Sequence, residues 1–206
     1  MAERSLVTPE FRDRVRARAA PIAVALGRLG LTPDALTVIG FVGTCAAALA
    51  AGLGQWAIAG LLVIAFGIFD LFDGALARAT GRTSAFGAFL DSTLDRTGEN
   101  LVLAGVAFGS ANAGYPGLVL LAGLAMATSS IVTYTRARAE AVGLHGEVGI
   151  APRPERLVLL AAGLVLTGLL GIREPWLALA LGLITVLSAV TVVQRIVHVR
   201  DQSTHR

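Results

Sequence analysis

The chain contains no lysine and only one cysteine, and both absences exclude kinds of chemistry. Without lysine there is no Schiff-base nucleophile and no phosphate-binding lysine of the P-loop type, and all seventeen basic residues are arginines. The lone Cys45 can form neither a disulfide within the chain nor a cysteine metal cluster. Aromatic residues make up only 6%, and no basic stripe with interleaved aromatics is present. We therefore expect no nucleic-acid partner.

Apolar residues are abundant instead. They make up 55% of the chain, and the mean hydropathy is +0.73, which predicts an all-α membrane protein. We expect six transmembrane helices in one membrane domain, residues 31–200, with a short tail at 201–206. Several reach the roughly 20 residues needed to span only if their charged ends stay helical. The expected helices cover 35–53, 56 into the acidic segment after 69, 84–109, 117–141, 155–170 and 176–199.

The arginines are distributed unevenly about these helices. Sixteen of the seventeen fall on one side, counting those at helix ends, and only Arg173 falls on the other. The positive-inside rule then places both termini in the cytoplasm. Trp56, Tyr115 and Trp176 lie at the arginine-poor ends, as an interfacial aromatic belt predicts. We expect a multi-pass protein of the cell's inner (plasma) membrane, with the arginine-rich helix ends facing the cytoplasm.

The first thirty residues have a different pattern. Apolar side chains recur at helical spacing with arginines between them, at Phe11, Val15, Ile22, Leu26 and Leu29. Within the segment 1–30, this pattern predicts an amphipathic juxtamembrane helix over about 8–29 that lies on anionic lipid at the cytoplasmic face. The alternative is a partly disordered basic arm.

Four aspartates form the most informative pattern in the chain. The order is D-x-x-D-G-x-x-A-R, then eight residues, then G-x-x-x-D-x-x-x-D, with Asp70, Asp73, Asp91 and Asp95 as the acids. Spacings of three and four residues place each pair on one helix face. A short connection near 81–83 makes the two helices antiparallel neighbours, so the four carboxylates can converge near the cytoplasmic surface.

Carboxylates gathered in this way need a positive partner. Oxygen-only ligands suit Mg²⁺ or Mn²⁺, and a pair of such ions is a known device for phosphoryl displacement. Gly74, Ala77 and Gly87 keep the neighbouring surface clear for a ligand, and Arg78 can meet a phosphate. Taken alone, the glycines would also suit close helix packing, and the acids a proton or ion pathway.

These residues together resemble the signature of the CDP-alcohol phosphotransferase family, and every fixed position of that signature is present. The resemblance implies six membrane helices, an amphipathic N-terminal helix and a homodimer. It also implies transfer of a phosphoalcohol from a CDP-alcohol to a second alcohol, with release of CMP.

The resemblance also implies roles for individual residues. Asp70, Asp73, Asp91 and Asp95 match the family's metal ligands, which would hold two ions of Mg²⁺ or Mn²⁺, and Asp95 also matches the proposed general base. The CDP site would be formed by Thr32, Pro33, Asp70, Asp73, Gly74, Ala77, Arg78 and Gly87. Within that set, Thr32 and Pro33 resemble a TPN-type segment in which Asp34 here replaces the commoner asparagine.

The second half of the chain is most similar to actinobacterial phosphatidylinositol phosphate synthases within that family. The similarity lies in the stretches 134–140, 149–150, 153–156 and 194–195. It implies CDP-diacylglycerol as donor and inositol phosphate as acceptor. The acceptor phosphate would be bound by five arginines: Arg136, Arg138, Arg153, Arg156 and Arg195. Relatives often have a lysine in that pocket, and some of these arginines could instead be topology determinants.

Three other functions remain open at this point. A phosphatidylglycerol phosphate synthase, or another CDP-lipid transferase, would also need basic residues for its acceptor. A cation transporter would use the carboxylates as a transit site, although Arg78 and Arg82 beside them repel cations. A non-catalytic membrane scaffold gives no reason for eight residues at fixed spacing.

Overall fold

The computed structural model describes residues 21–173 and 175–204, and every regular element within them is helical. The all-α prediction is confirmed for this part of the chain. Most of the expected amphipathic helix, residues 8–20, lies outside it. A short helix covers residues 21–28. The long helices that follow are α2 (Pro33–Gly52), α3 (Trp56–Thr80), α4 (Ala85–Asn112), α5 (Pro116–Ala141), α6 (Arg153–Leu170) and α7 (Trp176–Thr204).

Local sequence signals set the helix ends nearest the acidic motif. The Thr32 side chain caps α2 by accepting a hydrogen bond from the Ala35 amide at 3.2 Å, and Pro33 occupies the first turn. Gly81 ends α3 in the left-handed region, with φ of 65°. Ser84 then caps α4 by accepting from the Gly87 amide at 2.9 Å. These caps produce the tight turn that makes α3 and α4 antiparallel.

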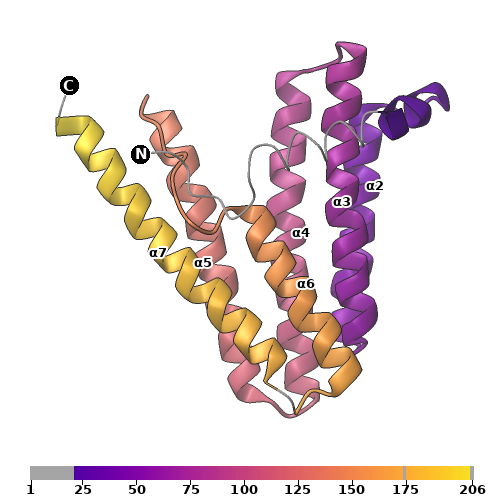
Figure 1. The fold of residues 1–206 in the computed structure, drawn as a ribbon, viewed down its shortest axis with the longest axis vertical. Coiled ribbons are helices and arrows are strands. Elements are labelled where there is room, and N and C mark those ends of the chain that lie inside the picture. The colour runs from indigo at the N-terminus through magenta and orange to yellow at the C-terminus, as the bar shows by residue number, and fades with distance from the viewer. Residues whose placement is uncertain (1–20, 174, 205–206) are drawn as a thin grey trace.

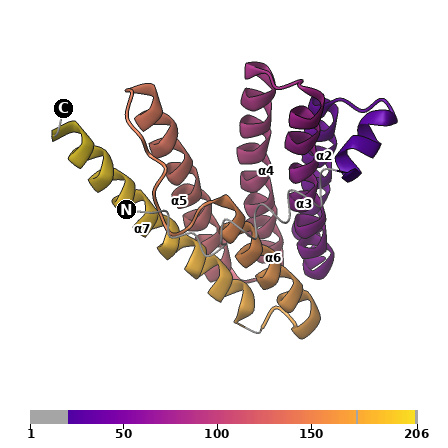
Figure 2. The ribbon, with the colours of Figure 1, turned by 45° about the horizontal axis from the view of Figure 1, so that its top comes forward.

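The helices form a bundle in which α6 begins part-way along its length (Figure 1). Helix α2 packs against α3 and α4, α5 packs against α4 and α7, and α6 packs against α3 and α7. The connection from α5 dips into the bundle before α6 starts, as Figures 1 and 2 both show. The first residues of α6 are therefore carried below the α3–α4 turn, to the level of the acidic motif.

Glycines allow α2 and α4 to approach closely. A Cβ added at Gly105 would overlap the Ala48 carbonyl, and one at Gly109 would overlap the Ala51 carbonyl. Small residues one helical turn apart are a common means of bringing membrane helices into backbone contact. This contact fixes α2 beside the helix that carries Asp91 and Asp95.

The apolar core lies toward the end of the bundle opposite the α3–α4 turn. It is built from small and branched residues of the long helices, including Leu103, Leu164 and Ile184. Trp56 belongs to this core and is only 7% exposed. Its ring therefore packs against neighbouring helices, whereas Trp176 is 38% exposed.

A second, smaller apolar cluster lies at the motif end of the bundle. The short helix at 21–28 contributes Ala23, which is fully buried with Leu36 of α2 and with Ala75 and Leu76 of α3. Figure 1 shows this helix in indigo, steeply inclined to α2. It therefore braces the last turns of α3, where the motif residues lie.

Four of the described helices are long and apolar enough to cross a membrane, namely α2, α3, α5 and α7. Helix α4 has Asp91, Asp95, Arg96 and Glu99 within its first fifteen residues, and α6 has only 18 residues, with Arg153, Glu155 and Arg156 in its first turn. The membrane character of the chain is therefore carried by those four helices, on length and composition.

Candidate active site

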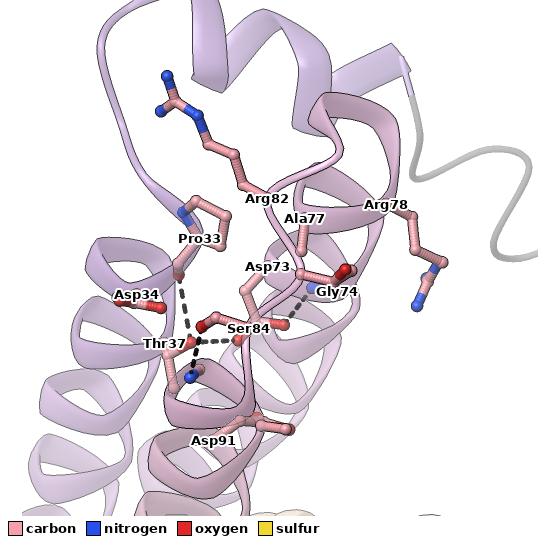
Figure 3. Close-up of a pocket in the computed structure, with 13 residues that line it drawn as sticks. Pro33, Asp34, Thr37, Asp73, Gly74, Ala77, Arg78, Arg82, Ser84 and Asp91 are labelled. Atoms are coloured by element: carbon pink, nitrogen blue, oxygen red, sulfur yellow. Dashed lines mark hydrogen bonds between the residues drawn. The ribbon is translucent and has the colours of Figure 1, made fainter.

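An open cleft of about 200 Å³ lies between the first turns of α2, the last turns of α3 and the first turns of α4. Asp73 and Asp91 face it from α3 and α4 (Figure 3). Of the eight residues expected at the CDP site, six line it: Pro33, Asp73, Gly74, Ala77, Arg78 and Gly87. Thr32 instead caps α2, and Asp70 lines a smaller neighbouring hollow with Asp95.

Glycines keep the cleft open on both motif helices. A Cβ at Gly87 would lie 3.1 Å from the Asp34 carboxylate, and one at Gly74 would lie 3.3 Å from the Arg78 guanidinium. Figure 3 shows that guanidinium turned away from Asp73 and Asp91. Arg78 is exposed, so it is available to a ligand entering from the polar end.

A residue of α2 orients one of the acids. The Thr37 hydroxyl donates to Asp73 Oδ2 at 2.7 Å, and the Gly74 amide donates to the other oxygen of the same carboxylate (Figure 3). Asp73 is only 7% exposed and Thr37 only 8%. Both carboxylate oxygens therefore have a fixed donor, and the side chain is held toward the cleft.

The guanidinium of Arg153 on α6 connects the acidic residues of α3 and α4. Nη1 of Arg153, the first residue of α6, lies 2.8 Å from Asp70 Oδ2 and 2.7 Å from Asp95 Oδ2. Asp70 is on α3 and Asp95 on α4, so one guanidinium bridges both motif pairs. The dipping connection before α6 is what brings Arg153 to this depth.

Like-charge repulsion acts between most of the four carboxylates. Asp70 is close enough to repel each of the other three, and Asp91 is close enough to repel Asp73 and Asp95. Among the described residues, no group of three or more acidic, histidine or cysteine side chains is already arranged as a metal site. The donor chemistry nevertheless fits a hard divalent cation, since all four groups offer oxygen and the bridging guanidinium occupies a place that needs positive charge.

The five arginines expected at the acceptor phosphate differ in their surroundings. Arg136 and Arg138 are exposed near the end of α5, and Arg136 pairs with Glu140 and Glu147. Arg153 is partly buried beside the acids. The remaining two, Arg156 and Arg195, are almost fully buried, at 2% and 6% exposed.

Arg195 ties the dipping connection to its neighbours. Its Nε donates to the Val148 carbonyl at 2.9 Å, and its Nη1 donates to the Val132 carbonyl of α5. The Thr191 hydroxyl, one turn earlier on α7, accepts from the Ala151 amide at 3.1 Å. Helix α7 thereby holds the connection in place.

Sequence reasoning missed Thr37 and Arg96 and left the role of Glu99 open. The only sequence signal for Thr37 is its position five residues after the Thr32 cap, and this position alone does not predict a contact with Asp73. Nε and Nη1 of Arg96 are buried and have no hydrogen-bond partner within the described part of the chain, and the arginine lies between Asp95 and Glu99 in sequence. Glu99 pairs with Arg156 rather than with its near neighbour.

Comparison with known proteins identifies the family. The profile of the CDP-alcohol phosphatidyltransferase family matches residues 30–194. The chain belongs to this family. The match spans both motif helices and Arg153 and Arg156 of α6, and it ends one residue before Arg195, so it includes every candidate site residue except Arg195.

Curated relatives match this family member over most of their length. It is 41% identical over 182 residues to a phosphatidylinositol phosphate synthase of Mycobacteroides abscessus, a match that covers 87% of this chain and 82% of the relative. It is 37% identical over 191 residues to an archaetidylinositol phosphate synthase of Methanothermobacter thermautotrophicus, covering 92% of each.

Solved structures of a relative agree with the fold. The phosphatidylinositol phosphate synthase of Mycobacterium tuberculosis with CDP-DAG bound superposes with a TM-score of 0.81 at 37% identity, covering 88% of this chain and 92% of that one. The same enzyme in complex with manganese and citrate gives a TM-score of 0.82 at 36% identity, covering 88% of both chains.

Proposed function

We propose that this family member is a phosphatidylinositol phosphate synthase, which transfers a phosphatidyl group from CDP-diacylglycerol to inositol phosphate and releases CMP. The observation that carries the proposal is the full acidic signature in a chain about 40% identical to synthases of this name. Asp73 and Asp91 line the cleft, and Asp70 and Asp95 line the hollow beside it. The identity of the acceptor is better supported than the identity of the lipid in the donor. Relatives that build on phosphatidyl and archaetidyl lipids differ in the lipid, but the names of both include inositol phosphate.

The acidic cluster would bind the donor's diphosphate through divalent cations. Asp70, Asp73, Asp91 and Asp95 provide the oxygen ligands, Mg²⁺ or Mn²⁺ being the ions that suit them. A related enzyme was crystallised with manganese. Bound divalent cations would neutralise the diphosphate and the leaving CMP. We propose two such ions, in line with four carboxylates on two helices.

The protein's own side chains would bind and orient the two substrates. Thr37 holds Asp73 toward the cleft, while Gly74 and Gly87 leave room for the nucleotide. Thr32 and Pro33 begin α2 at the mouth of the same cleft, where they would help to close the nucleotide site. Arg78 at the rim would meet a phosphate of the donor.

Asp95 would act as the general base. Its carboxylate takes the proton from the inositol hydroxyl as the hydroxyl oxygen attacks the phosphorus that carries diacylglycerol. The bond from that phosphorus to CMP breaks, and CMP leaves with the bonding electrons. Arg153 lies 2.7 Å from Asp95, so the base and a cation able to hold the acceptor's phosphate are adjacent. Orientation by that phosphate would reject free inositol.

The remaining arginines surround this position from α5, α6 and α7. Arg136 and Arg138 are exposed and would attract the charged acceptor from the cytoplasm. Arg195 and Arg156 stand deeper, and Arg195 lies within electrostatic reach of Arg136, Arg156 and Arg96. This concentration of positive charge supports a phosphorylated acceptor.

The membrane arrangement follows from the same reasoning. We propose that α4 and α6 also cross the bilayer, sheltered by the four apolar helices, which gives six spans with both termini in the cytoplasm. The cleft then opens to the cytoplasm at the inner leaflet of the plasma membrane, where a lipid-linked donor can reach it. A homodimer is part of the proposal and can be tested by cross-linking in membranes.

A competition assay tests the acceptor. The purified protein in detergent receives CDP-diacylglycerol, Mg²⁺ and equal amounts of differently labelled inositol phosphate and glycerol phosphate, and the lipid products are separated by thin-layer chromatography. The proposal predicts label from inositol phosphate in the lipid, and none with Asp95→Asn. Label from glycerol phosphate alone would make the chain a phosphatidylglycerol phosphate synthase. Cation flux in liposomes without nucleotide would indicate a transporter.

A further inference from the structure

Arg156 and Glu99 form a buried ion pair in which both side chains are almost completely hidden. Arg156 Nε lies 2.9 Å from Glu99 Oε1, and Nη2 lies 3.0 Å from Oε2. Arg156 Nη1 also donates to the Ala151 carbonyl at 2.9 Å. The exposed fractions are 2% for Arg156 and 5% for Glu99. The guanidinium is thus committed to protein partners on both of its edges.

The Arg156–Glu99 pair lies one helical turn from the Arg153–Asp95 pair on both helices. Glu99 lies one helical turn after Asp95 on α4, and Arg156 lies three residues after Arg153 on α6. Arg153–Asp95 and Arg156–Glu99 are therefore two successive rungs between the same two helices. The backbone of α6 packs chiefly against α3 and α7. The position of α6 relative to α4 is therefore fixed mainly by these two ion pairs.

We infer that Arg156 is a positioning residue and that its pair with Glu99 sets where Arg153 meets Asp95. The inference rests on the proposed function and changes the role that the sequence suggested for Arg156, which was direct binding of the acceptor's phosphate. A bidentate contact fixes distance and orientation together. With the deeper rung fixed, the first turn of α6 presents Arg153 to the base and to the acceptor.

The two roles predict different effects of neutralising the pair. Removing one member of a buried pair leaves an uncompensated charge, whereas replacing both by uncharged residues is often tolerated. A phosphate ligand, in contrast, is lost whenever Arg156 is lost, whatever residue 99 is. The double variant Glu99→Gln/Arg156→Gln therefore separates the two roles.

The first measurement is steady-state kinetics at a temperature at which every variant is folded. For positioning, Arg156→Gln and Glu99→Gln each lower kcat/KM for inositol phosphate by a similar factor, about tenfold, because either change displaces Arg153 from the base and the acceptor. The double variant regains part of the lost kcat/KM. A rise of about tenfold or more in the KM for inositol phosphate for Arg156→Gln and for the double variant, with Glu99→Gln near wild type, would overturn the inference.

The second measurement does not depend on catalysis. Melting temperatures in detergent are recorded for wild type, both single variants and the double variant, with Arg138→Gln on the exposed end of α5 as the control. The inference predicts that the two substitutions couple, so that the double variant melts above the value expected from adding the single losses. Additive losses overturn it. If wild type forms no lipid product with any acceptor, the proposed function fails, and this cycle still decides whether the pair exists.

Discussion

The hydrogen bond from Thr37 to Asp73 makes the orientation of a proposed metal ligand testable. Thr37→Val keeps the shape of the side chain and removes the hydroxyl that donates to Asp73 Oδ2 at 2.7 Å. A hydrogen bond to a charged group contributes about 1.5–3 kcal/mol. The Gly74 amide still holds the other oxygen, so we take the lower end, about 1.5 kcal/mol, which is about tenfold in kcat/KM.

The assay is the rate of lipid product formed at limiting CDP-diacylglycerol with inositol phosphate in excess. Thr37→Ser retains the hydroxyl and should keep most of the activity. Thr185→Val is the matched control, because Thr185 on α7 donates only to the Leu181 carbonyl, at 2.8 Å, far along the chain from the motif. If Thr37→Val retains wild-type kcat/KM, Asp73 does not need this donor and the reasoning is refuted.

Three further predictions concern packing, the bridging cation and the metal. Gly105→Ala should lower the melting temperature, since its Cβ would overlap the Ala48 carbonyl, whereas Gly123→Ala meets nothing within 4 Å and should not; equal melting temperatures would contradict the close contact of α2 with α4. Arg153→Gln should raise the KM for inositol phosphate about tenfold through loss of a charge-assisted contact, and an unchanged KM would place the acceptor elsewhere. Asp91→Asn should weaken Mn²⁺ binding followed by electron paramagnetic resonance, and wild-type affinity would exclude Asp91 as a ligand.

Local features of the fold could be predicted because their causes are local. Thr32 and Pro33 gave the start of α2, and Gly81 and Ser84 lie at the turn that makes α3 and α4 antiparallel. Caps and breakers act over a few residues, so their effect is visible in the sequence. The shared face of each aspartate pair follows from helix periodicity in the same way.

Contacts between distant segments could not be predicted from spacing. Arg153 and Asp70 are 83 residues apart, and Arg156 and Glu99 are 57 apart. Their pairing depends on the connection from α5 dipping into the bundle, which α7 holds in place through Arg195. The sequence shows that several arginines lie close together in the second half of the chain, but burial in the fold decides which of these arginines can reach a substrate.

The central claim is that the acidic cluster supports transfer from a CDP-lipid to a phosphorylated acceptor. The most direct measurement follows CMP release and formation of the inositol-containing lipid together, by mass spectrometry, with Mg²⁺ present or chelated. The account predicts that the two products appear in equal amounts, only when inositol phosphate and the divalent cation are both present. CMP released without an acceptor, or a lipid product formed after chelation, would contradict it.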